Sequence, residues 1–129
     1  MTTTMRRSFV ILSLVLIACS AKDEPAPASS QTAGALIVAY SADSADTFVA
    51  NRTDSVIVLD WLREVVQTHA LDLQAKTYPY GALVEQIGNR RNGDGGYWLY
   101  KVNGQMIPKS TDAYRVAWSD TVTFFFDER

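Results

Sequence analysis

The sequence is poor in the residues that most enzymes use for catalysis. Its 129 residues include one cysteine, Cys19, and one histidine, His69. A single cysteine excludes a disulfide within the chain. We recognise no Ser/His/Asp set, and no two carboxylates at a spacing typical of acid–base work. These absences favour a protein that is not an enzyme.

Clusters of positive charge are also scarce. Twelve Lys and Arg stand against fourteen Asp and Glu, which gives a formal net charge of −2. Arg90-Arg91 is the only basic pair after the N-terminal region. Nucleic-acid-binding proteins concentrate Lys and Arg on one face. The sequence therefore argues against a nucleic-acid partner.

The one long apolar run lies at the N-terminus. Arg6-Arg7 precede residues 9–18, which are almost all apolar but fewer than the about 20 residues of a spanning helix. The run ends in Leu-Ile-Ala-Cys, which resembles the site where bacterial signal peptidase cuts before a cysteine that carries lipid. We expect a lipoprotein signal peptide over 1–18 and lipid on Cys19, anchoring the chain in the bacterial cell envelope. Ser20 favours the outer membrane. The alternative is an ordinary signal peptide with an incidental cysteine.

Large apolar residues are missing again directly after Cys19. Residues 20–34 are rich in Ala, Pro, Ser and charge, a composition typical of a flexible linker. The rest of the chain has enough apolar residues for one small core. We therefore expect a lipidated Cys19 and linker over 19–34, and a single domain over 35–129.

The stretch from Gly95 to Gly104 (GGYWLYKVNG) predicts a central strand that ends in a tight Asn-Gly turn. Alternation places Tyr97 and Leu99 on one face of this strand, and Trp98 and Tyr100 on the other. Both faces therefore carry apolar surface. One face must meet the core, and the other needs a cover, a partner or a ligand.

The remaining pattern predicts one helix among several strands. Apolar residues at a 3.6-residue period predict a helix that ends near His69, with Asp54-Ser55 as its cap. Because Val56-Ile57-Val58 is β-branched, the start of this helix can equally be extended. Strands are expected over 35–40, 47–51, 71–78 and 121–126, with a further short apolar element over 82–87, a turn over 41–46, and loops over 88–96 and 105–113. The expected fold class is α+β, one main helix packed on a mixed sheet of four to five strands.

Four motifs occur in a characteristic order: Val58-Leu59-Asp60-Trp61-Leu62, YGALVEQI over 80–87, Tyr97-Trp98 with Val102-Asn103-Gly104, and Ala113-Tyr114 before Asp120. Together, over residues 36–126, they resemble the transcobalamin-like C-terminal domain (DUF4430). This β-grasp family is related to the soluble-ligand-binding β-grasp group. In the vitamin B12 carriers, the module closes over one face of cobalamin, opposite a helical barrel domain.

The resemblance implies a non-catalytic binding module that requires no cofactor. Its implied ligand is cobalamin or another corrinoid, and its implied partner is an outer-membrane transporter. This sequence contains no helical barrel, so half of the carriers' pocket is missing and cobalamin binding does not transfer whole. Ser119-Asp120 replaces the Gly-Asp that usually precedes the last strand of the family, and it should still form a turn.

The candidate ligand-binding residues are Tyr80, Tyr97, Trp98, Leu99, Tyr100 and Asn103. The three aromatics of the central strand either form a stacking platform for a flat ligand or pack against the helix and last strand. We expect Tyr100 to be an exposed contact. By resemblance, Leu99, Tyr100 and the loop over 103–111 match the region nearest the ligand in the carriers. Tyr78 and Tyr80 either form a second wall of the site or cap a turn.

Two further features have simple interpretations. Residues 89–96 (NRRNGDGG) lack the Lys-Ser/Thr of a phosphate-binding loop and have one carboxylate, Asp94, so a hairpin loop is favoured over a phosphate or calcium site. His69 suits the negative end of the predicted helix better than a role as an axial cobalt ligand. We therefore expect no metal site in the protein. The alternative to a corrinoid-binding module is a structural or protein–protein interaction module that has no small-molecule ligand and pairs with its partner by strand addition.

Overall fold

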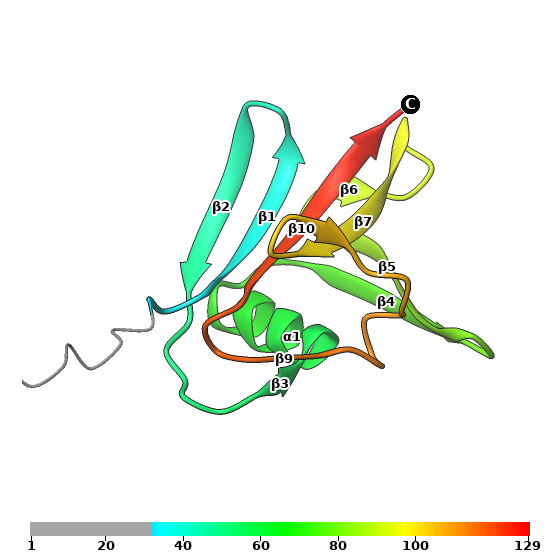
Figure 1. Cartoon of the computed structure of the whole chain (residues 1–129). Coiled ribbons are helices and arrows are strands. Elements are labelled where there is room, and N and C mark those ends of the chain that lie inside the picture. Colours follow the sequence, from blue (N-terminus) through cyan, green and yellow to red (C-terminus); the bar gives the residue numbers. More distant parts are fainter. Residues whose placement is uncertain (1–31) are drawn as a thin grey trace, which may run out of the picture. The chain divides into compact units, whose positions relative to one another are not determined.

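The computed structural model describes residues 32–129, which form one helix and ten strands (Figure 1). The predicted signal peptide, the predicted lipid site at Cys19 and most of the predicted linker lie outside the described residues. The helix is α1 (Val58–Thr68). The strands are β1 (Ala35–Ser41), β2 (Ser44–Val49), β3 (Val56–Ile57), β4 (Leu73–Tyr78), β5 (Gly81–Ile87), β6 (Arg90–Arg91), β7 (Gly96–Val102), β8 (Gln105–Met106), β9 (Arg115–Val116) and β10 (Thr121–Glu128).

The largest sheet is mixed and has the strand order β2-β1-β10-β7-β8. In this sheet the central strand β10 pairs with β1 in parallel, and the other three pairs of neighbouring strands are antiparallel. Two smaller sheets, β4-β5-β6 and β3-β9, complete the domain. The expected single helix and five-stranded mixed sheet are therefore present. The two small sheets were not expected, and they make this α+β domain mainly β.

The core lies between α1 and one face of the five-stranded sheet. The helix buries the apolar stripe that its sequence predicts, together with Trp61. Along β7 and β10, buried residues alternate with partly exposed ones, as expected for strands with a core on one side only. The buried residues of these two strands include Trp98, Tyr100, Phe124 and Phe126.

The first turn of α1 is capped by a distant segment. Its backbone N–H groups at Val58 and Leu59 donate to the carbonyl oxygens of Tyr114 (3.0 Å) and Thr111 (2.9 Å). No side chain caps the helix, so the prediction of an Asp54-Ser55 cap is wrong. The physical reason is that β3 precedes the helix directly and pairs with β9, which holds these carbonyl groups in place.

Several predicted loops contain short strands or ordered contacts. The turn after β1 is shorter than expected because β2 begins at Ser44, while β6 and β8 lie inside the expected loops over 88–96 and 105–113. Gly34, which composition places in the linker, is buried and donates its N–H to the carbonyl of Trp118 at 2.9 Å. The turn at Ser119-Asp120 is confirmed, since Asp120 Oδ2 accepts from the Ala117 N–H at 2.8 Å.

Candidate functional site: an aromatic-floored hollow

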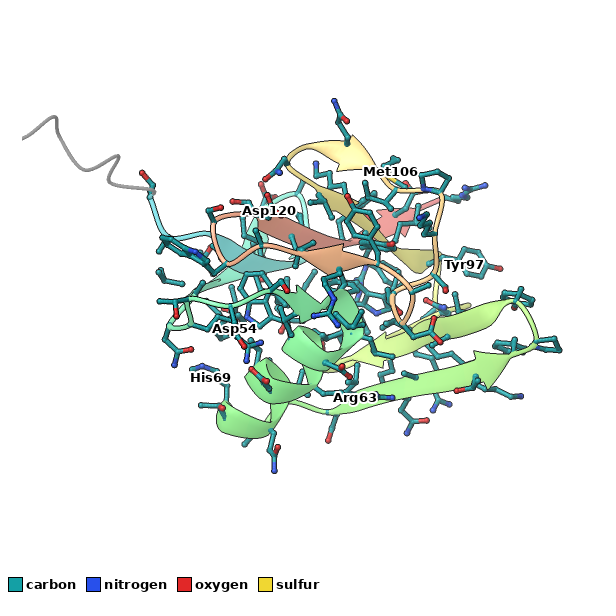
Figure 2. The ribbon with its side chains drawn as sticks, turned by 60° about the horizontal axis from the view of Figure 1, so that its bottom comes forward. Asp54, Arg63, His69, Tyr97, Met106 and Asp120 are labelled. Atoms are coloured by element: carbon teal, nitrogen blue, oxygen red, sulfur yellow. The ribbon has the colours of Figure 1, made fainter. Side chains whose placement is uncertain are left out.

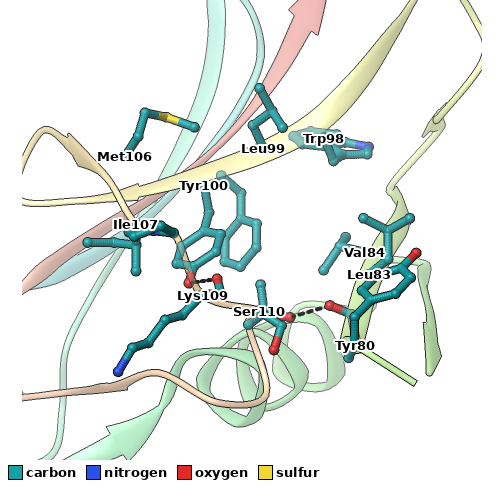
Figure 3. Close-up of a pocket in the computed structure, with 14 residues that line it drawn as sticks. Tyr80, Leu83, Val84, Trp98, Leu99, Tyr100, Met106, Ile107, Lys109 and Ser110 are labelled. Atoms are coloured by element: carbon teal, nitrogen blue, oxygen red, sulfur yellow. Dashed lines mark hydrogen bonds between the residues drawn. The ribbon is translucent and has the colours of Figure 1, made fainter. Parts of the chain in front are cut away.

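A hollow of about 280 Å³ lies where β7 faces β5 and the loop between β8 and β9 (Figure 3). This concave site is called the hollow. It is lined by Tyr80, Ala82, Leu83, Val84, Trp98, Leu99, Tyr100, Met106, Ile107, Pro108, Lys109, Ser110, Thr111 and Phe124.

The floor of the hollow is aromatic and buried. Trp98 is 3% exposed, Tyr100 is 8% exposed, and the Tyr100 and Phe124 rings stack with their centroids 5.8 Å apart. The Trp98 indole N–H donates to the carbonyl of Arg90 at 2.8 Å. The expectation that Tyr100 is an exposed contact is wrong, because Trp98 and Tyr100 share the face of β7 that meets the core. Both residues still line the hollow from below.

The rim of the hollow is formed by exposed apolar side chains. Tyr80 is 72% exposed, and Leu83 and Met106 are exposed as well. Tyr80 also stacks on Tyr78 with the ring centroids 5.1 Å apart, and the Tyr78 hydroxyl donates to Glu85 Oε1 at 2.9 Å. The two rings therefore pack on each other at the turn, and Tyr80 also lines the hollow, whereas Tyr78 is not among its lining residues.

The loop that forms one wall is fixed to β5 by Asp112. Its Oδ1 accepts from the backbone N–H of Ala82 (3.0 Å) and from the hydroxyl of Ser110 (2.6 Å). These hydrogen bonds, that from Ser110 first, lower the pKa of the Asp112 carboxyl. The Thr111 hydroxyl donates to the carbonyl of Ala82 at 3.4 Å. The wall is thus joined to the neighbouring strand without any ligand.

Tyr100 connects the floor to the same loop. Its hydroxyl donates to the carbonyl oxygen of Lys109. Burial, with smaller contributions from Tyr114 and Asp112, raises the pKa of Tyr100 to about 12. The hydroxyl therefore stays protonated near neutral pH and remains a donor to the loop.

Asn92 joins β5 to β7 next to two residues that line the hollow, Val84 and Trp98. Its side-chain N–H donates to the carbonyl of Val84 (3.0 Å), and its side-chain oxygen accepts from the backbone N–H of Trp98 (2.7 Å). Residues 89–96 are therefore more than a hairpin loop, because one of their side chains bonds to two strands. No local sequence pattern indicates this role of Asn92.

The other two candidates of the central strand lie away from the hollow. Tyr97 is 52% exposed and shares the outward face of the sheet with Leu99 and Phe125. Asn103 has a positive φ of 50° in the β7–β8 turn, and its side chain pairs with Asp120 Oδ1 (2.9 Å) and the Thr121 N–H (2.9 Å). Tyr80, Trp98, Leu99 and Tyr100 are thus the candidates that the structure brings together.

Sequence reasoning missed the side chains of β5 and of residues 106–111 as individual lining residues. The resemblance did indicate the loop over 103–111 as a whole. Nothing in the local sequence marks Leu83 or Met106, because an apolar residue on a short strand is equally compatible with a core position. Their exposure at the rim is visible only in the folded chain.

His69 lies outside the hollow. His69 follows α1 as predicted, and its ring lies 4.5 Å from that of Phe48 (centroid to centroid). Figure 2 shows His69 beside the helix, away from Met106 at the rim of the hollow.

Within residues 32–129, no three His, Cys, Asp or Glu side chains come together as a potential metal site. The helix of this part of the chain is too short and too polar to cross a membrane.

A solved structure from Ruminococcus gnavus has a similar fold. It is described as "a putative metal binding protein", and the two chains are 14% identical with a TM-score of 0.58. The match covers 76% of this chain and 98% of that one. At this identity, the likeness concerns the fold. No curated protein sequence matches this chain.

A protein-family model matches residues 62–128, just over half of the chain. Its description is "Domain of unknown function (DUF4430)". The matched residues include all that line the hollow. The resemblance drawn from the four sequence motifs is confirmed, and the chain belongs to the DUF4430 family.

Proposed function

We propose that this chain is a non-catalytic binding module and that the hollow is its ligand-binding site. The observation that carries the proposal is a concave, aromatic-floored surface whose wall is held in place by Tyr100, Thr111 and Asp112. Small-molecule sites are typically concave, mostly apolar and largely formed before the ligand arrives. A preformed wall lowers the entropy that binding must offset.

A corrinoid is the ligand that the resemblance to the transcobalamin-like domain favours. A whole corrinoid is much larger than about 280 Å³, so only one of its groups can enter the hollow. The rest of the molecule would lie across the rim at Tyr80, Leu83 and Met106. Its other face would then need a second surface, which we assign to a partner.

The description of the Ruminococcus gnavus protein raises metal binding as another possibility for this chain. The side chains of residues 32–129 do not support an ion held by protein donors alone. A corrinoid brings its own cobalt, already held by the ring. Our proposal therefore assigns no metal ligands to the chain, and it requires no other cofactor.

We also propose that lipid on Cys19 anchors the module in the bacterial envelope, in the outer membrane. Residues 20–33 would hold it beside a transporter that takes up its ligand. Mass spectrometry of the mature protein tests the anchor. The expected result is a diacylated or triacylated Cys19 and loss of membrane association in Cys19→Ser, and a soluble wild-type protein would contradict it.

Isothermal titration with cyanocobalamin and cobinamide tests the binding function. We expect heat from at least one corrinoid with the wild-type chain, alone or with the transporter present. In Leu83→Trp a bulky ring at the rim should reduce the affinity at least tenfold. Val49→Trp, at a 68% exposed position outside the hollow, should bind normally. If neither corrinoid gives heat, the proposed ligand is wrong. If Leu83→Trp binds with full affinity, the proposed site is wrong.

The second candidate is a protein–protein interaction module without a small-molecule ligand. The observation in its favour is β2, a terminal strand of the sheet that is exposed along most of its length. An extended segment of a partner could pair with its free edge. A photo-crosslinking residue at Thr47 should then capture a protein in the envelope. Capture at Leu83 and not at Thr47 would argue against strand addition.

A further inference from the structure

We infer that the group which enters the hollow is neutral, flat and of one or two rings. This inference rests on the proposed function, because it defines the ligand chemistry of the same site. It follows from three properties of the lining: its size, its hydrogen bonds and its charge.

The size of the hollow sets an upper limit on the group. An apolar cavity of about 150 Å³ in another protein holds one benzene ring. At about 280 Å³, the hollow is not quite twice as large. It therefore has room for a fused two-ring system but not for a larger macrocycle. The mouth is open, so a molecule of any size can carry that group on its edge.

Three of the four hydroxyl groups of the lining are already hydrogen-bonded within the chain. Tyr100 donates to Lys109, Thr111 donates to Ala82, and Ser110 donates to Asp112. The hydroxyl of Tyr80 belongs to a side chain that is 72% exposed at the rim. A polar or charged group on the floor would lose its water and gain few hydrogen bonds in exchange, which disfavours its entry.

The charge of the lining gives no reason for an ion to enter. Lys109 is the single charged side chain among the lining residues, and it is exposed. Figure 3 shows its ammonium end directed away from Tyr80 and Leu83. The carboxylate of Asp112 is outside the lining and is occupied by Ala82 and Ser110. Neither charge therefore compensates an ionic ligand inside the hollow.

The shape of the floor favours a flat group over a branched one. The rings of Trp98, Tyr100 and Phe124 give a ligand ring stacked or edge-to-face contacts, which are favourable arrangements between aromatics. Met106 at the rim has a flexible side chain that can close over such a ring. The same contacts would leave gaps around a branched aliphatic group.

A matched set of three probes tests this chemistry: indole, which is neutral, indole-3-acetate, which is an anion, and tryptamine, which is a cation. Each is titrated into the ¹⁵N-labelled full chain, and backbone amide shifts are followed. We expect indole to shift Leu83, Ile107 and Ser110, and to bind at least tenfold more tightly than either ion. Leu83→Trp should abolish these shifts, and Val49→Trp should leave them unchanged.

The outcomes separate the inference from the proposed function. Equal or tighter binding of an ionic probe in the hollow overturns the inference and leaves the binding function standing. The inference is also overturned if no probe shifts these amides, whereas the binding function is judged by the corrinoid titration. A normal thermal unfolding curve for Leu83→Trp ensures that a lost signal reflects the filled rim.

Discussion

Asn92 and Trp98 are joined by a 2.7 Å hydrogen bond from the Trp98 backbone N–H to the Asn92 side-chain oxygen. The other end of the same amide donates to the carbonyl of Val84 at 3.0 Å. One side chain thus connects β7 to β5 at a place where the two strands do not pair with each other. This connection fixes the position of β7 at Trp98, whose indole forms part of the hollow's floor, relative to β5 at Val84.

Replacing Asn92 by alanine should therefore destabilise the domain. The substitution leaves a partly buried donor and acceptor without partners, at a cost of about 1–3 kcal/mol in the free energy of unfolding. Urea unfolding followed by circular dichroism measures it. Asn89→Ala, an exposed position in the same loop, is the control and should change stability by less than about 0.5 kcal/mol. Similar losses in the two variants would contradict the bridging role.

Asp112 should make the wall of the hollow sensitive to acid. Its pKa is lowered in the folded state, so its contribution to stability is present above the unfolded pKa and is lost as pH falls through the folded value. Thermal unfolding of wild type and Asp112→Ala, scanned downward from neutral pH, should show curves that converge in acid. Hydrogen exchange at the Ala82 amide should be faster in the variant at neutral pH.

The control for Asp112 is Asp94→Ala, which removes a carboxylate from the turn before β7. Because no side-chain hydrogen bond of Asp94 fixes the wall, its loss should leave hydrogen exchange at the Ala82 amide unchanged at neutral pH. A constant difference between wild type and Asp112→Ala down to strongly acidic pH would show that the carboxylate itself is not responsible for the stabilisation.

Tyr100 should ionise only in strongly alkaline solution. Its pKa is raised to about 12, so the stability that it contributes is fully present below the ordinary value of 10.0 and is lost as pH rises through about 12. Absorbance at the tyrosinate band should show a group that titrates at about pH 12 in wild type and is missing in Tyr100→Phe. Tyr97→Phe, at an exposed position, should keep the late group. If Tyr97→Phe also lost the late-titrating group, the assignment of that group to Tyr100 would be wrong.

Gly81 should tolerate no side chain, because the β4–β5 turn packs closely on the wall. A Cβ there would lie 2.2 Å from Ser110 Oγ, and the residue has a φ of +129°. Gly81→Ala should lower the melting temperature more than Gly104→Ala, whose φ of +80° is strained but whose Cβ would meet open space. Equal effects would mean that backbone strain alone accounts for both, and that Ser110 moves freely.

Alternation along β7 could be predicted from the sequence, but the direction of its two faces could not. Tyr97 and Leu99 are as apolar as Trp98 and Tyr100, so the residues of this strand fit a core on either side. Long-range pairing decides the matter, since β10 places Phe124 and Phe126 opposite Tyr100 and Trp98. The second face of the strand, which carries Tyr97 and Leu99, remains partly exposed, as the alternation predicts.

The start of the helix and the wall of the hollow could not be predicted from local sequence either, because both depend on contacts between distant segments. Asp54-Ser55 has the chemistry of a cap, yet the carbonyl groups that accept from the first turn come from Thr111 and Tyr114, more than fifty positions later. A contact of this kind depends on the pairing of β3 with β9, two strands of two residues each. Such short strands have no periodicity by which a sequence could reveal them.

A map of backbone amide shifts during titration with cyanocobalamin tests the central claim most directly, because it reports where on the domain a ligand sits. The account predicts that the largest changes fall at Leu83, Met106 and Ser110, around the mouth of the hollow. Changes confined to Val49 and Tyr97, or a spectrum that cyanocobalamin leaves unchanged even with the transporter present, would contradict it.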